Sequence, residues 1–485
     1  MNKPIRRVSI FCLVLILALM ARVNWVQGVQ ASAWASNPHN ERAKYDRYAS
    51  PRGNIIVGGQ PVTKSDFVNG LRYKYKRAWV DGPMYAPVTG YSSQIFDASQ
   101  LEKLEDGVLS GTDSRLFFRN TLDMLTGKPK KGGDVVTTID PKVQRAAFEG
   151  LGNKKGAAVA IDPRTGAILA LVSTPSYDPG TFAGGTDADS AAWNALQADP
   201  NQPMLNRALR QTYPPGSTFK LVTAATAFET GKFQEPGDAT STPETYILPG
   251  THTPLVNDSP DEPCTDATLL DAMALSCNTV FGKIGAELGG DTLRAQAEKF
   301  GFNNDKVDIP IRATASYFPS SSSPDGTAMD AIGQHDTRAT PLQMAMVAAA
   351  IANNGSLMEP YLVAQEGAPG HAVSTHTEHR MSQAVSPDTA RKLQQLMEDV
   401  VKKGTGKRAN IPGVTVGGKT GTAQHGQDNA GKPFAWFVSY AKDGDSKQVA
   451  VAVVVEDGAA QSSEISGGSI AAPIAKSMMQ AALGK

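Results

Sequence analysis

Apolar residues recur at helical spacing in several segments after about residue 140. Val143, Ala147 and Leu151 mark the first, and Asp140 followed by Pro141 supplies an N-terminal cap and a proline at the first helical position. Comparable patterns predict further helices, over residues 217–229, 269–276, 341–353, 387–402 and 470–483.

Short apolar runs bounded by turn residues occur near both ends of the same region. Residues 157–161 and 167–173 flank an Asp-Pro-Arg-Thr-Gly turn, and residues 434–441 and 448–456 flank Lys-Asp-Gly-Asp. A third strand is predicted to lead into the second pair at 414–416. Sheet segments at both ends with helices between them predict an α+β fold, an antiparallel sheet covered by helices.

The N-terminus carries an apolar run over residues 8–21 behind Lys3, Arg6 and Arg7. The run fits a signal peptide, with small-residue cleavage sites at 31–33 or 33–35. It also fits a membrane anchor, because Arg22 can snorkel and thereby extend the span to about Val26. We expect the anchor, over residues 1–30, with the rest of the chain on the extracytoplasmic side of the cell membrane.

Between the anchor and the first strong helix lies a polar, mixed segment with a short predicted strand at 54–57. It contains no constellation of chemically reactive residues, so we expect a small α+β spacer or docking domain. A basic, glycine-rich stretch at 127–133 is typical of a linker. The sequence therefore predicts two domains after the anchor, over residues 35–133 and 134–485.

Composition changes this picture little. With 485 residues, 41% apolar and 19% charged, the chain is globular, and 47 basic residues balanced by 47 acidic ones give no electrostatic case for nucleic-acid binding. Beyond Cys12 in the apolar run, the cysteines are Cys264 and Cys277. An oxidising compartment favours a disulfide between them, and the alternative is two free thiols.

The first candidate for chemistry is Ser217 in the run Tyr-Pro-Pro-Gly-Ser-Thr-Phe-Lys at 213–220. The prolines and Gly216 predict a stiff turn that enters a buried helix, which places Ser217 where free backbone N–H groups favour an oxyanion. Lys220 lies one turn away, and burial lowers the pKa of a lysine. A serine beside such an amine is a nucleophile with a candidate base. Alone, the S-x-x-K pattern is weak.

Two other motifs lie in the same domain. Ser276 and Asn278 fall on a predicted turn between helices, and can point the same way. Lys419, Thr420, Gly421 and Thr422 lie in a predicted glycine-rich strand, where residues 419 and 421 face one side and 420 and 422 the other. Each motif also fits a plain polar turn or edge strand.

In combination, S-x-x-K, S-x-N and K-T-G occur in the order known for penicillin-binding proteins and serine β-lactamases. The chain resembles the class B, monofunctional branch of the penicillin-binding transpeptidases. Segments 331–334, 340–345 and 418–424 resemble it too, and 88–92 and 115–117 are similar to compact actinobacterial members. One departure is the pair Arg52-Gly53, which lacks the Asp-Arg-Asn-Gly continuation common in this class.

The resemblance implies a role for each motif residue. Ser217 would be the acylated nucleophile and Lys220 its general base, Ser276 would relay a proton, and Asn278 would hold the substrate amide. Lys419 would supply positive charge, with Thr420 and Thr422 gripping a terminal carboxylate beside Gly421. Backbone N–H groups of residues 217 and 422 would form the oxyanion hole, each worth about 3 kcal/mol. No cofactor and no metal are expected.

The implied activity is D,D-transpeptidation, in which the D-Ala-D-Ala end of a peptidoglycan stem peptide acylates the serine and passes to an amine. Implied partners are stem peptides, β-lactam antibiotics, the membrane and a membrane-embedded glycan polymerase. A D,D-carboxypeptidase and a β-lactam sensor or silent scaffold are the alternatives. A class A β-lactamase is disfavoured because no E-x-x-x-N follows Asn278 where its glutamate would lie.

Overall fold

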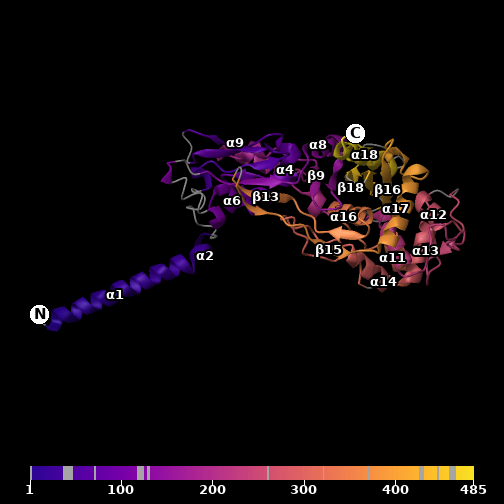
Figure 1. Cartoon of the computed structure of the whole chain (residues 1–485), viewed down its shortest axis with the longest axis horizontal. Helices are drawn as coiled ribbons and strands as arrows, with labels where there is room; N and C mark the ends of the chain where they lie inside the picture. The colour runs from indigo at the N-terminus through magenta and orange to yellow at the C-terminus, as the bar shows by residue number, and fades with distance from the viewer. Residues whose placement is uncertain are drawn as a thin grey trace.

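The structure is a computed structural model of the chain, and it describes residues 3–35, 47–69, 73–116, 125–127, 131–258, 262–320, 322–368, 371–424, 431–444, 447–457 and 466–485. A long N-terminal helix leads to a small module, and beyond it lies a larger body that contains the C-terminus (Figure 1). The predicted α+β architecture is confirmed.

The N-terminal helix α1 (Lys3–Gly28), followed by α2 (Ala31–Ala35), projects away from the rest of the chain (Figure 1). None of its described side chains is buried, and it is long and apolar enough to cross a membrane. A signal sequence meets the same criterion. Length and composition therefore support a membrane segment and leave its cleavage open.

The central sheet of the larger body has five strands in the order β16-β17-β18-β8-β9, all antiparallel. Both predicted hairpins are confirmed and lie side by side. The strands are β8 (Lys155–Ile161), β9 (Ile168–Thr174), β16 (Thr415–Ala423), β17 (Phe434–Asp443) and β18 (Lys447–Asp457). The third C-terminal strand thus extends through the K-T-G motif.

Helices cover both faces of this sheet. Val449, Val451 and Val453 of β18 belong to the cluster shared with α8 and α18, whereas Ala450 and Ala452 belong to the cluster shared with α16. Because both faces are buried, the strand reads as a continuous apolar run and not as an alternation. The sheet is therefore a rigid, dry support for whatever lies at its edge.

The predicted helices are confirmed with small shifts at their ends. Asp140 accepts hydrogen bonds from the backbone N–H groups of Lys142 and Val143, which caps the first of them. The six are α8 (Pro141–Leu151), α11 (Lys220–Glu229), α12 (Leu269–Leu275), α16 (Pro341–Ala352), α17 (Pro387–Lys402) and α18 (Ala472–Leu483). The last is preceded by a π-helical turn at Gly467–Ala471, where an earlier helical start was predicted.

The remaining elements of the larger body surround these. Its other described helices are α9 (Asp187–Ala198), α10 (Arg207–Arg210), α13 (Asn278–Leu288), α14 (Gly290–Lys299) and α15 (Pro324–Asp330), with 3-10 turns η2 (Pro179–Phe182), η3 (Gly216–Phe219) and η4 (Lys407–Ala409). Short strands pair as β10 (Tyr246–Ile247) with β11 (Pro254–Leu255), and β12 (Ser356–Met358) with β15 (Arg380–Gln383).

The small module is built on a second sheet, in the order β14-β13-β7-β1-β2. Strands β1 (Ile55–Val57) and β7 (Asp134–Thr137) run parallel, and β13 (Val363–Ala368) pairs antiparallel with β7 and with β14 (His371–Thr375). The predicted boundary at 133/134 stays a prediction, and residues 128–130 of the predicted linker lie outside the described residues. The sheet crosses this boundary and recruits strands from far downstream.

Smaller elements complete the module. They are β2 (Gln60–Pro61), β3 (Thr63–Phe67), β4 (Tyr75–Trp79), α4 (Gly82–Thr89), β5 (Ser92–Ser93), β6 (Asp97–Ala98), α5 (Gln100–Leu104), α6 (Asp106–Ser110) and the 3-10 turn η1 (Ser114–Leu116).

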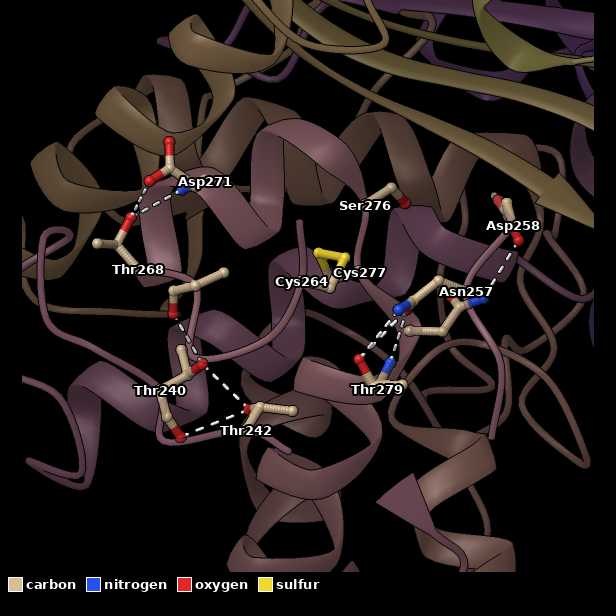
Figure 2. Close-up of a disulfide and its surroundings, with 12 residues drawn as sticks. Thr240, Thr242, Asn257, Asp258, Cys264, Thr268, Asp271, Ser276, Cys277 and Thr279 are labelled. Atoms are coloured by element: carbon tan, nitrogen blue, oxygen red, sulfur yellow. Dashed lines mark hydrogen bonds between the residues drawn. A yellow bond between two sulfur atoms is a disulfide. The ribbon is translucent and has the colours of Figure 1, made fainter. Parts of the chain in front are cut away.

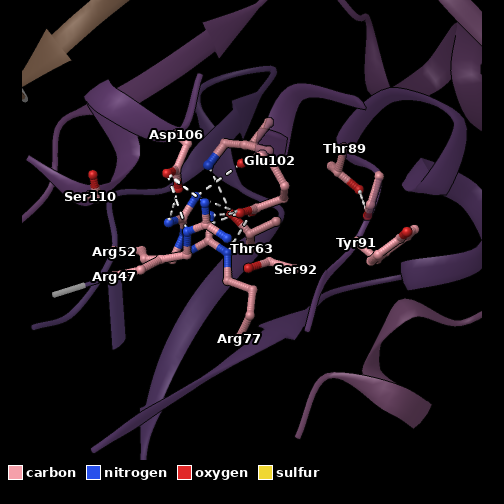
Figure 3. A network of polar contacts seen from close by, with 12 residues as sticks. Arg47, Arg52, Thr63, Arg77, Thr89, Tyr91, Ser92, Glu102, Asp106 and Ser110 are labelled. Atoms are coloured by element: carbon pink, nitrogen blue, oxygen red, sulfur yellow. Dashed lines mark hydrogen bonds and ion pairs between the residues drawn. The ribbon is translucent and has the colours of Figure 1, made fainter. Parts of the chain in front are cut away.

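A buried network of charges holds this module together (Figure 3). The carboxylate of Glu102 lies 3.1 Å from the guanidinium of Arg52 and 2.6 Å from that of Arg77, and all three side chains are buried. Arg52 also bonds to Asp106, over 2.6 Å. Buried charges are tolerated only when paired. The arginine of the unusual Arg52-Gly53 pair therefore has a structural partner here.

Gln144 ties the two parts of the molecule together, which generates a stability prediction. Its fully buried amide donates to the carbonyls of Met84 (2.9 Å) and Leu171 (3.0 Å) and accepts from the Leu171 N–H (2.8 Å). Gln144→Leu leaves these backbone groups unpartnered, and each such group costs about 1–3 kcal/mol. We expect the free energy of unfolding to fall by about 3 kcal/mol.

Guanidinium unfolding of the full-length protein, followed by tryptophan fluorescence, measures this loss. Gln197→Leu is the matched control, because Gln197 is exposed on α9. Equal stability of the two variants would contradict the bridging role of Gln144.

Candidate active site

Ser217 lies in the first turn of a buried helix, as predicted, although that turn is 3-10 before α11 begins at Lys220. Gly216 has a φ of +53°, and its N–H donates to the Gly333 carbonyl over 2.9 Å. A Cβ atom at Gly216 would lie 3.1 Å from the Cβ of Ala423. Glycine therefore permits both the reversal and the close approach of the Ser217 turn to strand β16.

The approach to this turn is fixed by the sheet. Trp436 of β17 donates its indole N–H to the Pro214 carbonyl over 3.1 Å, and the Tyr213 hydroxyl donates to Glu456 of β18 over 2.6 Å. Both aromatic side chains are fully buried. The position of Ser217 thus follows from the rigid sheet and not from local propensity alone.

Ser276 lies in the break between α12 and α13, as the sequence predicts, whereas Asn278 is already the first residue of α13 and not part of the turn. Ser276 has a φ of +68°, the left-handed conformation, which ends α12, and its N–H donates back to the carbonyls of Ala272 and Met273. Helix α13 begins at Asn278. The short break directs both side chains toward Lys220.

Lys419 enters from strand β16. It pairs with Val438 of β17 and is fully buried, on the face of the sheet that the cluster around α16 covers. Directly paired residues share a face of a sheet. Thr420 is opposite Phe437, which packs on the other face with α18. The predicted alternation of residues 419 and 420 is confirmed.

The three motifs meet at the hydroxyl of Ser276. Lys419 Nζ donates to Ser276 Oγ over 2.8 Å, and Lys220 Nζ lies 3.3 Å from the same atom. Lys220 Nζ also donates to the Ser276 carbonyl (2.6 Å) and to Asn278 Oδ1 (2.7 Å). Among the described residues, these three acceptors take all its hydrogen bonds, and Ser217 takes none. Catalytic contacts of this kind commonly tighten only once substrate is bound.

Burial lowers the pKa of both lysines, and the nearby charges act on each of them differently. Desolvation first, and then the charge of Lys419, hold the pKa of Lys220 well below its usual value. Desolvation lowers the pKa of Lys419 to about 7, against the opposing effect of Asp258 and Glu262. Because the charge of Lys419 adds to desolvation at Lys220, Lys220 is the amine favoured to be neutral and therefore able to accept a proton.

A cleft of about 630 Å³ opens beside this cluster. Ser217, Asn278 and Thr422 line it, together with Leu255, Val256, Asn257, Asp258, Met329, Ile332, Gln334, Gln424, Pro433 and Ser466. Among these lining residues, Asp258 alone carries an ionisable side chain. Thr420 does not line the cleft, and its hydroxyl bonds to that of Thr405 over 2.6 Å.

A disulfide joins Cys264 to Cys277, directly beside Ser276 (Figure 2). The two Cα atoms lie 5.8 Å apart. The segment before α12 folds back as this distance requires, because Thr240 N–H bonds to the Ala267 carbonyl and Asp266 N–H to the Thr242 carbonyl. The bridge therefore anchors the start of α13 to the chain that precedes α12.

Other residues that shape the cleft were not found from the sequence. Asn257 and Asp258 carry no motif, and only their contacts with the S-x-N turn reveal them (Figure 2). The sequence identifies the 331–334 segment only through the resemblance. In the structure, the fully buried Asp330 accepts hydrogen bonds from the N–H groups of residues 336 and 337, which shapes the loop carrying Gly333 and Gln334.

Comparisons with known proteins identify two families along the chain. The penicillin binding protein transpeptidase domain matches residues 156–480, and the penicillin binding protein A dimerisation domain matches residues 52–135. The peptidoglycan D,D-transpeptidase PbpA of Mycolicibacterium smegmatis is 42% identical, over 100% of this chain and 99% of the relative. The protein of the same name from Mycobacterium tuberculosis is 40% identical, over 100% and 99%.

Solved structures agree with this assignment. The crystal structure of PBPA from M. tuberculosis matches with a TM-score of 0.84 at 40% identity, covering 90% of this chain and all of the other. Its penicillin G acyl-enzyme complex matches with a TM-score of 0.83 at 39% identity, with the same coverage. With its motif residues gathered in one cleft, this chain belongs to the penicillin-binding protein transpeptidase family.

Proposed function

We propose that this protein is a peptidoglycan D,D-transpeptidase that works through an acyl-enzyme at Ser217 and is inhibited covalently by penicillins. One observation carries the proposal: the amines of Lys220 and Lys419 both contact Ser276 Oγ, at the edge of the cleft that Ser217 lines. The acyl-enzyme structures of a relative that aligns with 90% of this chain support the same chemistry.

In the first half-reaction, Ser217 Oγ bonds to the carbonyl carbon of the penultimate D-Ala while its proton passes to neutral Lys220 Nζ. The tetrahedral intermediate then breaks its C–N bond. Ser276 Oγ gives a proton to the leaving amine of the last D-Ala, and Lys220 restores it across the 3.3 Å contact. One proton has moved from Ser217 to the leaving group.

The second half-reaction reverses this path. The amine of a neighbouring stem peptide attacks the ester carbonyl, its proton passes through Ser276 to Lys220, and the Ser217–acyl bond breaks as Ser217 Oγ takes the proton back. A carboxypeptidase would use water in place of the amine. Incubation with a D-Ala-D-Ala peptide and a competing amine distinguishes the two by the product formed.

Backbone groups supply the largest electrostatic contribution. The N–H groups of Ser217 and Thr422 are proposed to bind the developing oxyanion, since both residues line the cleft. The substrate carboxylate is assigned to the Lys419 ammonium and the Thr422 hydroxyl. Thr420 supports this strand through Thr405 in the free enzyme and would have to exchange that bond to contact substrate.

The setting of the enzyme is part of the proposal. Helix α1 would anchor the chain in the membrane with Lys3, Arg6 and Arg7 inside and everything after α2 outside. The module over residues 35–133 would serve as a non-catalytic spacer or docking domain of the dimerisation or pedestal type, with the catalytic domain over 134–485. The shared sheet of β7, β1 and β13 supports a firm connection between the two. A membrane-embedded glycan polymerase is the proposed protein partner.

A labelled penicillin tests the nucleophile. Full-length protein in detergent is expected to form a stable adduct that survives denaturing electrophoresis, whereas Ser217→Ala forms none because no oxygen is left to acylate. Ser466→Ala is the matched control, since that serine lines the same cleft. Labelling of a folded Ser217→Ala protein would exclude the assignment, and release of label within seconds would indicate a β-lactamase.

Two variants of Lys220 separate base from charge. Lys220→Arg keeps a cation but stays protonated, so both it and Lys220→Ala are expected to lower the acylation rate constant by about 10²–10⁴. The exposed Lys232 supplies the control variant, Lys232→Ala. A rate independent of Lys220 would assign the base elsewhere.

The pH dependence of acylation in the wild type tests both lysines. Lowering the pH through the depressed pKa of Lys220 protonates the base and slows acylation. Raising the pH past the Lys419 pKa of about 7 removes the ammonium charge that is assigned to the substrate carboxylate, and so also slows acylation.

A further inference from the structure

The segment Leu255–Asp258 is packed against the turn that carries Ser276 and the start of α13 at Asn278. Leu255 is buried and pairs with Tyr246 in the β10–β11 hairpin. A Cβ atom added to Gly282 of α13 would lie 2.3 Å from Leu255 Cδ2, so the glycine leaves room for this side chain. The segment is therefore anchored on α13 before it reaches the cleft.

Asn257 fixes the segment to the N-terminus of α13 (Figure 2). Its Oδ1 accepts from the Thr279 N–H over 3.1 Å and from the Thr279 hydroxyl over 3.3 Å. The N-cap residue of this helix, Cys277, makes no side-chain cap because its sulfur is in the disulfide. Asn257 supplies the missing cap from another part of the chain.

Asp258 and the Val256 carbonyl accept hydrogen bonds from the side-chain amide of Asn278. Its Nδ2 donates to the Val256 carbonyl over 3.0 Å and to Asp258 Oδ1 over 3.2 Å, while its Oδ1 accepts from Lys220 over 2.7 Å. A primary amide has two N–H donors, so both are engaged. A flipped amide would turn its NH₂ toward the Lys220 amine and its oxygen toward the Asp258 carboxylate, which is unfavourable on both sides.

We propose that Asp258 is a positioning residue for acyl transfer, which holds the Asn278 amide in the orientation that receives Lys220 and places a negative charge beside the two catalytic lysines. The inference rests on the transpeptidase function proposed above. A substrate carbonyl that binds Asn278 Nδ2 takes the place of one of its two present acceptors, and the remaining one keeps the amide oriented.

The electrostatics agree with this geometry. The charged groups that act on Lys220 are Lys419 from β16, which lowers its pKa, and Asp258 and Glu262, which raise it. The same two carboxylates raise the pKa of Lys419. Removal of the Asp258 charge therefore lowers both pKa values, and the pH range in which Lys220 is neutral and Lys419 charged moves to lower pH.

Asp258→Asn and Asp258→Ala separate the effect of the negative charge from that of the hydrogen bond to Asn278. The asparagine keeps an acceptor at Oδ1 and loses the charge, so the pH profile of acylation by labelled penicillin is expected to shift by about one unit to lower pH, with its maximum retained. The alanine also loses the hydrogen bond, so the maximum is expected to fall about tenfold. Full-length protein in detergent is used throughout.

Asp266→Asn is the matched control, because this exposed carboxylate lies on the same segment of the chain and is not among the groups that act on either lysine. Its profile should coincide with that of the wild type. An Asp258→Asn profile that coincides as well would overturn the proposal, as would an unchanged maximum in folded Asp258→Ala. If Asp258→Ala does not fold, the Asp258→Asn profile decides alone. A wild type that penicillin does not label would instead refute the proposed function.

Discussion

The catalytic centre depends on one hydroxyl shared by two buried amines. Ser276 Oγ lies 2.8 Å from Lys419 Nζ and 3.3 Å from Lys220 Nζ, and both lysines are fully buried. Two ammonium groups so placed repel each other, and burial disfavours each charge. In the proposed mechanism, Lys220, whose pKa is held well below its usual value, serves as the base, and Lys419 carries its charge below its pKa of about 7. Position, and not residue type, thus gives two lysines different roles.

This arrangement requires three segments that are distant in the sequence to come within hydrogen-bonding distance of one another. The two-sided burial of the central sheet makes that possible, because packed strands hold Lys419 and, through Trp436 and Tyr213, the turn of Ser217. Ser276 belongs to the helical part of the domain and lies in the short break between α12 and α13. A site built on helices and strands holds its side chains more precisely than a site built on loops.

Local patterns predicted much of this fold. The bounds of α17 followed from a Pro start and an apolar period, and the three motifs indicated the site because each encodes a local geometry. Pairing of β13 with β7 was not predicted, since Glu366 and Val135 are distant in sequence and no local signal selects the partner. Asp258 was missed for the same reason: its role exists only through its contact with Asn278.

The backbone conformation of Ser276 costs free energy, and contacts in the same part of the structure offset that cost. A φ of +68° on a residue other than glycine costs about 1–2 kcal/mol, and glycine would remove the hydroxyl. The adjacent bridge closes a separation of 13 residues, for which chain entropy predicts about 3 kcal/mol. Asn257 adds a cap to the next helix. The strained backbone and the bonds that offset it therefore lie in one helical hairpin, so the hydroxyl can stay in place when substrate displaces contacts of Asn278.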